Sequence, residues 1–329
     1  MKDRSNTRPS LDELSKGIDQ SDRVLLSRAI TIVESKLPSD QDLATVLLDK
    51  ILHKSGNSIR IGITGVPGVG KSTFIEAFGK SLTSLGKKVA VLSVDPSSSR
   101  SKGSILGDKT RMNELSMDPD AFIRPSPSGT SLGGVAARTR ENILLCEAAG
   151  YDVILVETVG VGQSEIAVKN MVDFFLLLML SGGGDELQGI KRGIMEMADL
   201  IVINKADGDN LKSAKMAKKA FENALHLFPP HESNWTVPVT LCSALEKSGI
   251  EEVWGIIQDF KDKTQHSGFF NNQRKLQNVT WLKELIKEKL ESSFYTDEQK
   301  RTQIRLIEEK VSAGELSVRH AVKTLFNEK

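Results

Sequence analysis

The chain has 329 residues, of which 39% are hydrophobic and 26% are charged, and its formal net charge is +1. This composition is typical of a globular protein with a large core, and it excludes a disordered chain. The near-neutral charge gives no global field that would favour nucleic acid or a membrane surface, so we predict neither as a partner. Two separate cysteines, Cys146 and Cys242, argue against a disulfide framework and against a structural zinc site.

No targeting or membrane segment is evident. The first residues, MKDRSNTRPSLDEL, contain no apolar stretch of the kind found in secretory signals. The longest apolar run, Phe174 to Leu180, is too short for a membrane-spanning helix, which needs about 20 residues. We therefore expect a cytoplasmic protein.

Residues 1–55 are predicted to form an N-terminal helical extension. Apolar residues recur there at the spacing of an amphipathic helix. They are Val24, Leu25, Ile32 and Val33 in a first group, and Leu43, Val46, Leu47 and Ile51 in a second. Pro38 separates the two groups, and Ser39 or Asp40 is the expected N-cap of the second helix.

From residue 56 to residue 267, apolar strands alternate with charged helical segments. The expected strands are 59–64, 88–94, 152–157, 173–180, 199–203 and 237–241. Several are continuous apolar runs, such as Val153 to Val156, and such runs suit strands that helices cover on both faces. We therefore predict an α/β domain with a mostly parallel central sheet flanked by helices.

After residue 267 the composition shifts again. Residues 268–329 are rich in Lys, Glu, Gln and Leu and contain no proline. This composition favours a C-terminal helical arm, with helices at 273–292 and 297–311 and a short one near 315–327.

The run GVPGVGKS, from Gly65 to Ser72, fits the pattern GxxxxGK[ST] of a phosphate-binding loop. It follows an apolar strand and precedes a helical pattern, which is the context that the motif requires. In such a loop, backbone N–H groups and the positive end of the helix bind phosphate, the lysine reaches the β- and γ-phosphates, and the hydroxyl binds Mg²⁺. The predicted nucleotide-binding residues of this loop are Gly65, Val66, Pro67, Gly68, Val69, Gly70, Lys71, Ser72 and Thr73.

A second motif predicts which base is bound. Asn204-Lys205-Ala206-Asp207 directly follows an apolar strand and matches the NKxD pattern of guanine-binding loops. The carboxylate of Asp207 can accept both the ring N–H and the exocyclic amino group of guanine, whereas adenine lacks this pair of donors. We therefore expect Asn204, Lys205 and Asp207 to bind GTP or GDP. The loop Ser243-Ala244-Leu245, after a later strand, is the expected cover of the base.

Acidic residues at strand ends are the candidate Mg²⁺ ligands, together with Ser72. Glu157 ends an apolar strand and precedes a glycine-containing loop, where an acidic residue can hold Mg²⁺ through a water molecule. Asp95 follows another apolar strand, so we expect it at the same edge of the sheet. Asp108 is either a further Mg²⁺ ligand or the cap of a helix that starts near Thr110, and the residues alone favour neither.

Six motifs occur together in this chain: GVPGVGKST, VDPSSSRSKGSILGDKTRM, SLGGVAARTRE, VILVETVGVGQSE, LSGGGDELQGIKRG and NKAD. As a set they resemble the MeaB/ArgK family of P-loop GTPases, and the resemblance covers nearly the whole chain. It implies that Lys71, Ser72, Asp95, Asp108 and Glu157 serve the phosphates and Mg²⁺, and that the catalytic residues are Lys71, Asp108, Glu157 and Lys191. Lys191 matches, with Asp185 and Gln188, a third switch segment from Ser181 to Gly193.

The resemblance also implies partners. Members of the family bind methylmalonyl-CoA mutase or a related cobalamin-dependent acyl-CoA mutase. They gate the loading of adenosylcobalamin, protect or reactivate the mutase with GTP, and form homodimers through the C-terminal arm. We therefore expect a Mg²⁺-dependent GTPase that acts as a mutase chaperone. The segment Ser99 to Gly103 departs from the family pattern, so its role in the first switch is not predicted.

Two alternatives belong to other functional classes. One is a nucleotide-dependent kinase or ATPase accessory to lysine, arginine and ornithine transport, which the guanine-reading Asp207 disfavours. The other is nickel insertion, which would require a Cys/His-rich tract that this sequence lacks.

Overall fold

The structure, a computed structural model, describes residues 8–94, 112–125, 132–158, 164–181, 192–229 and 232–326. The chain folds into two compact units, Met1–Gln277 and Asn278–Lys329. The division into an extension, a GTPase domain and an arm, at residues 55 and 267, stays a prediction. None of the helices in the described ranges is long and apolar enough to cross a membrane.

The first unit is built on a seven-stranded sheet whose order is β3-β2-β4-β1-β5-β6-β7. The strands are β1 Ile59–Gly65, β2 Val89–Val94, β3 Ala121–Arg124, β4 Val153–Thr158, β5 Phe174–Met179, β6 Leu200–Ile203 and β7 Val239–Leu241. All neighbouring strands pair in parallel. Because β1 is central and later strands are added on both sides of it, the loop after β1 opens at the crevice where such sheets bind ligands.

The strands form where the sequence has continuous apolar runs. Every residue of β4 and of β5 is buried, as expected for strands that helices cover on both faces. The parallel sheet and its six predicted strands are confirmed, with small differences at the strand ends. β3 was not predicted from the sequence, because this strand has only four residues and pairs with β2 alone at the edge of the sheet.

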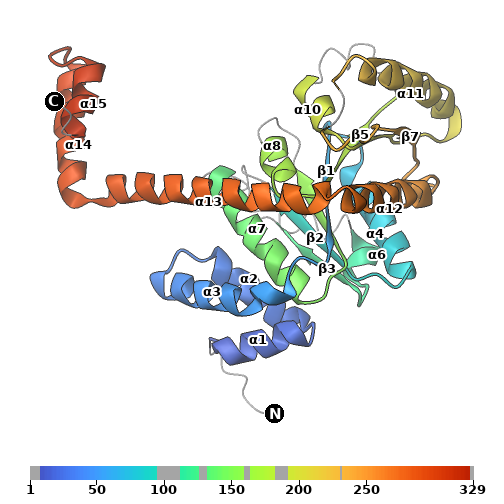
Figure 1. The fold of residues 1–329 in the computed structure, drawn as a ribbon, viewed down its shortest axis with the longest axis horizontal. Helices are drawn as coiled ribbons and strands as arrows, with labels where there is room; N and C mark the ends of the chain where they lie inside the picture. Colours follow the sequence, from blue (N-terminus) through green and yellow to red (C-terminus); the bar gives the residue numbers. More distant parts are fainter. Residues whose placement is uncertain are drawn as a thin grey trace. The chain divides into compact units, whose positions relative to one another are not determined.

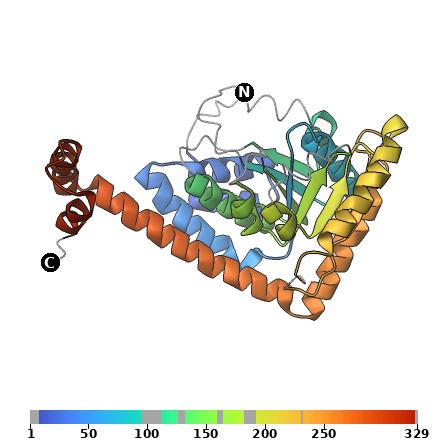
Figure 2. The same cartoon turned by 90° about the horizontal axis from the view of Figure 1, so that it is seen from above.

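Helices cover both faces of the sheet (Figures 1 and 2). One face packs against α4 Lys71–Ser84, α6 Asn113–Ser116 and α12 Ile250–His266. The other packs against α1 Leu11–Asp19, α2 Arg23–Glu34, α3 Pro38–Ile51, α7 Leu132–Ala148 and α8 Ser164–Lys169. A third apolar cluster lies between β6 and the helices α10 Arg192–Met197 and α11 Leu211–Leu225. These three clusters fix the strand ends that carry the candidate site.

The three N-terminal helices pack against α7 and share one apolar cluster with it. α1 begins with a capping box, in which the Ser10 and Glu13 side chains each accept a backbone N–H of the other residue. The prediction that Ser39 or Asp40 caps the third helix is wrong. α3 begins at Pro38, because the fixed φ of proline suits the first helical position and its missing N–H is not needed there.

The second unit comprises the later part of α13 Phe269–Thr296, then α14 Glu298–Ser312 and α15 Val318–Leu325. The ring of Phe294 stacks on that of Phe326 at 4.9 Å between centroids. Lys300 Nζ donates to the carbonyl of Leu325 at 2.7 Å, which ties α14 to the end of α15. The predicted C-terminal helices are confirmed, although α13 begins earlier than expected.

A buried ionic cluster lies at the amino-terminal end of β1. Arg60 donates from Nε and Nη2 to the two carboxylate oxygens of Glu147, each at 2.8 Å. Arg274, near the start of α13, pairs with Asp173 at 2.6 Å and donates to the carbonyl of Ser58 at 2.7 Å. These bonds fasten the first turns of α13 to the strand end opposite the ligand crevice.

Two opposing effects set the pKa of Glu147. Burial alone raises it, but the hydrogen bonds and charge of Arg60, with help from Ser58 and Arg274, hold this pKa below its ordinary value of 4.5. A carboxyl group with a lowered folded-state pKa stabilises the fold fully above its unfolded-state pKa. This contribution is lost as the pH falls through the folded-state value.

Replacing Glu147 with glutamine is expected to lower the free energy of unfolding by about 3 kcal/mol at pH 7, because Arg60 would be left buried without its charge partner. The difference from the native chain should shrink as the pH falls below about 4.5. Urea unfolding followed by circular dichroism at several pH values measures both effects. The exposed Glu251→Gln is the matched control, and a loss that is the same at every pH would contradict the prediction.

Candidate functional site

The connection between β1 and α4 contains the predicted phosphate loop. Gly70, the N-cap of α4, has a φ of 92°, in the left-handed region that favours glycine. A Cβ atom on Gly65 would lie 2.5 Å from the carbonyl oxygen of Leu178, so this close approach of two strands requires glycine. α4 begins at Lys71, and the N–H groups of its first turn open on the loop. A phosphate group can bind there to these N–H groups and to the positive end of the helix.

The Lys71 side chain lies over this loop. Its Nζ donates to the carbonyl of Gly65 at 2.8 Å. Burial lowers the pKa of Lys71, and the negative charges of Glu157 and Glu165 partly offset that effect. The two carboxylates therefore favour the charged ammonium form, which is the form that can attract phosphate oxygens.

Ser72 and Glu157 place a hydroxyl group and a carboxylate side by side. Glu157 pairs in register with Ile63 of the neighbouring β1 and is 8% exposed. Ser72 Oγ donates to Glu157 Oε1 at 3.4 Å. Oxygen ligands of this kind suit Mg²⁺, which takes one or two carboxylates besides the phosphates of its nucleotide. Within the described ranges no group of three or more His, Cys, Asp or Glu side chains could hold a metal ion.

Several residues of the predicted site lie outside the described residues. They are Asp95, Asp108, Asp185, Gln188 and Lys191, as well as the divergent segment 99–103. Their assignments to Mg²⁺ and to catalysis stay predictions. The described residues before this gap end at Val94, and those after it begin at Met112, ahead of α6, where Glu76 of α4 accepts the Glu114 N–H at 2.7 Å.

The side chain of Asn204 joins three loops at the carboxyl ends of the strands. It is 1% exposed, its Nδ2 donates to the carbonyl of Val69 at 2.9 Å, and its Oδ1 accepts the Ala244 N–H at 3.2 Å. Lys205 Nζ donates to the carbonyl of Gly68 at 2.9 Å. The structure thus brings the phosphate loop, the NKxD loop and the Ser243–Leu245 loop together.

Asp207 is held by a residue of the third loop. Ser243 Oγ donates to the Asp207 carboxylate, and Ser243 and Ala244 are buried, whereas Leu245 is 80% exposed. A carboxylate oriented in this way can accept two N–H donors on one edge of a base. Guanine offers that pair and adenine does not, so the geometry favours guanine.

Sequence reasoning missed three polar residues near these loops. Thr158, the last residue of β4, donates to Thr64 of β1 at 2.8 Å, and both are buried. Glu165 in the first turn of α8 is 3% exposed and raises the pKa of Lys71. The strand-end positions of the two threonines and the acidic residue in VGQSE are the signals that could have identified them.

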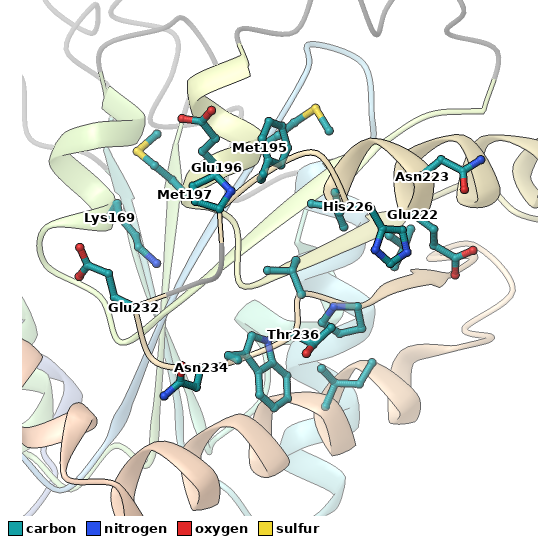
Figure 3. A pocket seen from close by; sticks show the side chains of 18 of the residues that line it. Lys169, Met195, Glu196, Met197, Glu222, Asn223, His226, Glu232, Asn234 and Thr236 are labelled. Atoms are coloured by element: carbon teal, nitrogen blue, oxygen red, sulfur yellow. The ribbon is translucent and has the colours of Figure 1, made fainter.

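A cavity of about 1160 Å³ lies on the first unit near the amino ends of β6 and β7 (Figure 3). Met195 on α10, His226 after α11 and Thr236 before β7 are among the side chains that line it. The nucleotide loops follow the carboxyl ends of these strands, so the cavity is separate from the candidate site.

A parallel sheet with a phosphate loop after its central strand and an NKxD loop after β6 defines the class of P-loop GTPases. The family model of the methylmalonyl-CoA mutase-associated GTPase MeaB matches residues 26–299. The chain therefore belongs to this family: it binds guanine nucleotides and hydrolyses GTP. The resemblance predicted from the motifs is confirmed.

Individual relatives agree with the family match. The chain is 52% identical to GTPase ArgK of Escherichia coli (strain K12) over 289 residues, which cover 88% of this chain and 87% of that protein. It is 47% identical over 326 residues to the mouse protein named methylmalonic aciduria type A homolog, mitochondrial, covering 96% of this chain and 79% of the relative. A crystal structure described as LAO/AO transport system kinase matches with a TM-score of 0.77 and 44% identity, and the match covers 96% of each chain.

Replacing Asp207 with asparagine is expected to weaken GDP binding on the order of 100-fold or more, because the amide would present an N–H group to a guanine donor. Binding of xanthosine diphosphate should improve, since xanthine carries a carbonyl oxygen in place of the amino group. Competition against a fluorescent GDP analogue measures both affinities. Asp209→Asn, an exposed neighbour, is the matched control, and an unchanged GDP affinity in Asp207→Asn would contradict guanine reading by this carboxylate.

Proposed function

We propose that this GTPase acts in the cytoplasm as a chaperone for a cobalamin-dependent acyl-CoA mutase of the methylmalonyl-CoA mutase type. The observation that carries the proposal is the match over residues 26–299 to a family described as mutase-associated. The mouse relative supports it, because its name refers to methylmalonic aciduria. In this role, GTP binding and hydrolysis gate adenosylcobalamin loading and protect or reactivate the mutase.

The proposed chemistry is hydrolysis assisted mainly by charge stabilisation. Lys71 contacts the β- and γ-phosphates, and Asp207 selects guanine. Ser72 and Glu157 hold Mg²⁺, which, when bound, supplies positive charge to the phosphate oxygens. Asp108 and Lys191 are proposed as further catalytic residues on the basis of the family resemblance.

A second candidate function is nucleotide-dependent phosphorylation that serves amino-acid transport. One observation favours it, the 44% identity to the structure described as a transport system kinase. Asp207 argues against an ATP-dependent kinase, because adenine would leave its carboxylate without a matching donor. ATP-dependent phosphorylation of a transport binding protein, at a rate above that of GTP hydrolysis, would establish this alternative.

We also propose that the chain forms a homodimer through its second unit. Four apolar side chains of α13 recur at helical spacing and so share one face: Val279, Leu282, Ile286 and Leu290. They are between 50% and 65% exposed. A second copy of the chain carries the same stripe, so a two-fold pairing of the helices would cover both stripes.

GTP turnover should rise roughly tenfold or more when a cobalamin-dependent acyl-CoA mutase from the same source is added, which corresponds to a barrier lower by about 1.4 kcal/mol. Cofactor exchange on the mutase should become dependent on GTP and not on ATP. Phosphate release and cobalamin absorbance measure both in one reaction with Mg²⁺, and Lys71→Ala should abolish both effects. Unchanged turnover without complex formation would refute the mutase proposal and leave the GTPase assignment intact.

Replacing Ile286 with aspartate is expected to convert the dimer to a monomer, because a charge would be buried in the apolar contact between two copies. Analytical ultracentrifugation at micromolar concentration measures the oligomeric state. Glu288→Lys, two residues along and therefore on another face of α13, should remain dimeric. Identical behaviour of the native chain and Ile286→Asp would rule out pairing through this stripe.

A further inference from the structure

The guanine-binding loop contains a residue in an uncommon backbone conformation. Lys205 has a φ of 56°, in the left-handed region that residues with a Cβ atom rarely adopt. This turn allows Lys205 Nζ to reach Gly68, while the next residue, Ala206, donates its N–H to the carbonyl of Cys242 at 3.0 Å. Asp207 follows directly, so the bonds that hold the Lys205 backbone also determine where this carboxylate points.

Asn210 holds the carbonyl group of Lys205. Its Nδ2 donates to that oxygen at 2.6 Å. Asn210 directly precedes α11, a position where asparagine usually caps the helix with its side chain, yet its side chain makes no capping bond. Because a carbonyl oxygen only accepts, the amide must present its NH₂ group to Lys205, and its own oxygen is free to accept from elsewhere.

That oxygen accepts a bond from the end of β5. Ser181 Oγ donates to Asn210 Oδ1 at 2.5 Å. Ser181 lies two residues beyond β5 and is the first residue of the predicted third switch segment. The backbone N–H of Asn204 also donates to the carbonyl of Met179 at 2.8 Å, so the end of β5 and the guanine-binding loop are already neighbours. Asn210 therefore bridges them through two side-chain bonds.

We propose that Asn210 is a positioning residue for guanine recognition that couples the loop carrying Asp207 to Ser181 at the end of β5. An amide side chain suits this position, because its NH₂ group donates to the carbonyl of Lys205 while its oxygen accepts from Ser181. Coupling is reciprocal, so a change that displaces Ser181 weakens guanine binding, and guanine binding in turn favours the observed position of Ser181. This role of Asn210 lies in nucleotide binding and does not depend on the proposed mutase partner.

Two substitutions separate the two bonds of the bridge. Asn210→Asp keeps the acceptor for Ser181 but places a carboxylate against the carbonyl of Lys205. Ser181→Ala keeps the bond to Lys205 and removes the other. Ser55→Ala is the matched control, because Ser55 donates a comparable bond to the carbonyl of Leu52 near the opposite end of β1.

The experiment measures the affinity of each protein for GDP and for inosine diphosphate, together with the thermal midpoint. Inosine diphosphate lacks the amino group that Asp207 accepts, so a misplaced carboxylate costs more with GDP. We expect Asn210→Asp to weaken GDP binding on the order of tenfold and Ser181→Ala roughly threefold, and both to reduce the preference for GDP. The two losses should not add in the double variant, whereas Ser55→Ala should bind normally.

A preference for GDP that stays within about twofold of the native value in both variants would overturn the proposal, even if the thermal midpoint falls. That result would assign Asn210 to the fold alone. A loss in Asn210→Asp without any loss in Ser181→Ala would overturn the coupling. If Asn210→Asp does not fold, Ser181→Ala still decides, and Ser181→Thr, which keeps the hydroxyl group, should retain the native preference.

Discussion

The nucleotide site depends on one buried side-chain amide, that of Asn204. Its two bonds join the loop after β6 to the phosphate loop at Val69 and to the loop after β7 at Ala244. The side chain is 1% exposed, so the loss of either partner would leave a polar group without water or protein contact, at a cost of about 1–3 kcal/mol. The loops therefore hold one another in place, and recognition of the phosphates and of the base are not independent.

The order of the strands makes this contact possible. β1 and β6 are separated only by β5, and all three end at the same edge because they run in parallel. Gly65 lets the end of β1 approach the carbonyl of Leu178 on β5 more closely than any larger residue would allow. Below this edge, Phe74 and Phe78 of α4 stack at 5.5 Å between ring centroids within the same core cluster as α12. Packing on this face of the sheet thus fixes where the N-terminus of α4 lies relative to the phosphate loop.

Most of this arrangement could be predicted from short sequence motifs. Glycine-rich and NKxD patterns directly after apolar runs are short and self-contained, so they place Gly65–Ser72 and Asn204–Asp207 at strand ends without any knowledge of the fold. β3 was missed because a four-residue strand is too short to show a hydrophobic period. The start of α3 was misplaced because proline favours the first helical position, so the helix begins at Pro38, before the polar residues that were expected to cap it. The bonds from Thr158 to Thr64 and from Ser181 to Asn210 join residues 94 and 29 positions apart. These two bonds depend on the order of the strands in the sheet, which hydrophobic periodicity does not predict.

The charges around Lys71 give a physical reason for the proposed Mg²⁺. Glu157 and Glu165 both act on the Lys71 ammonium group, which lies in a partly buried position. A nucleoside triphosphate brings more negative charge into the same place, where water screens its repulsion from the carboxylates poorly. Without a cation, Glu157 would therefore oppose the binding of GTP. A divalent cation held by Ser72 and Glu157 would offset this repulsion, and the charge of the same carboxylate would then favour binding. An acidic residue beside a phosphate loop is compatible with GTP binding only if the nucleotide and the metal ion bind together.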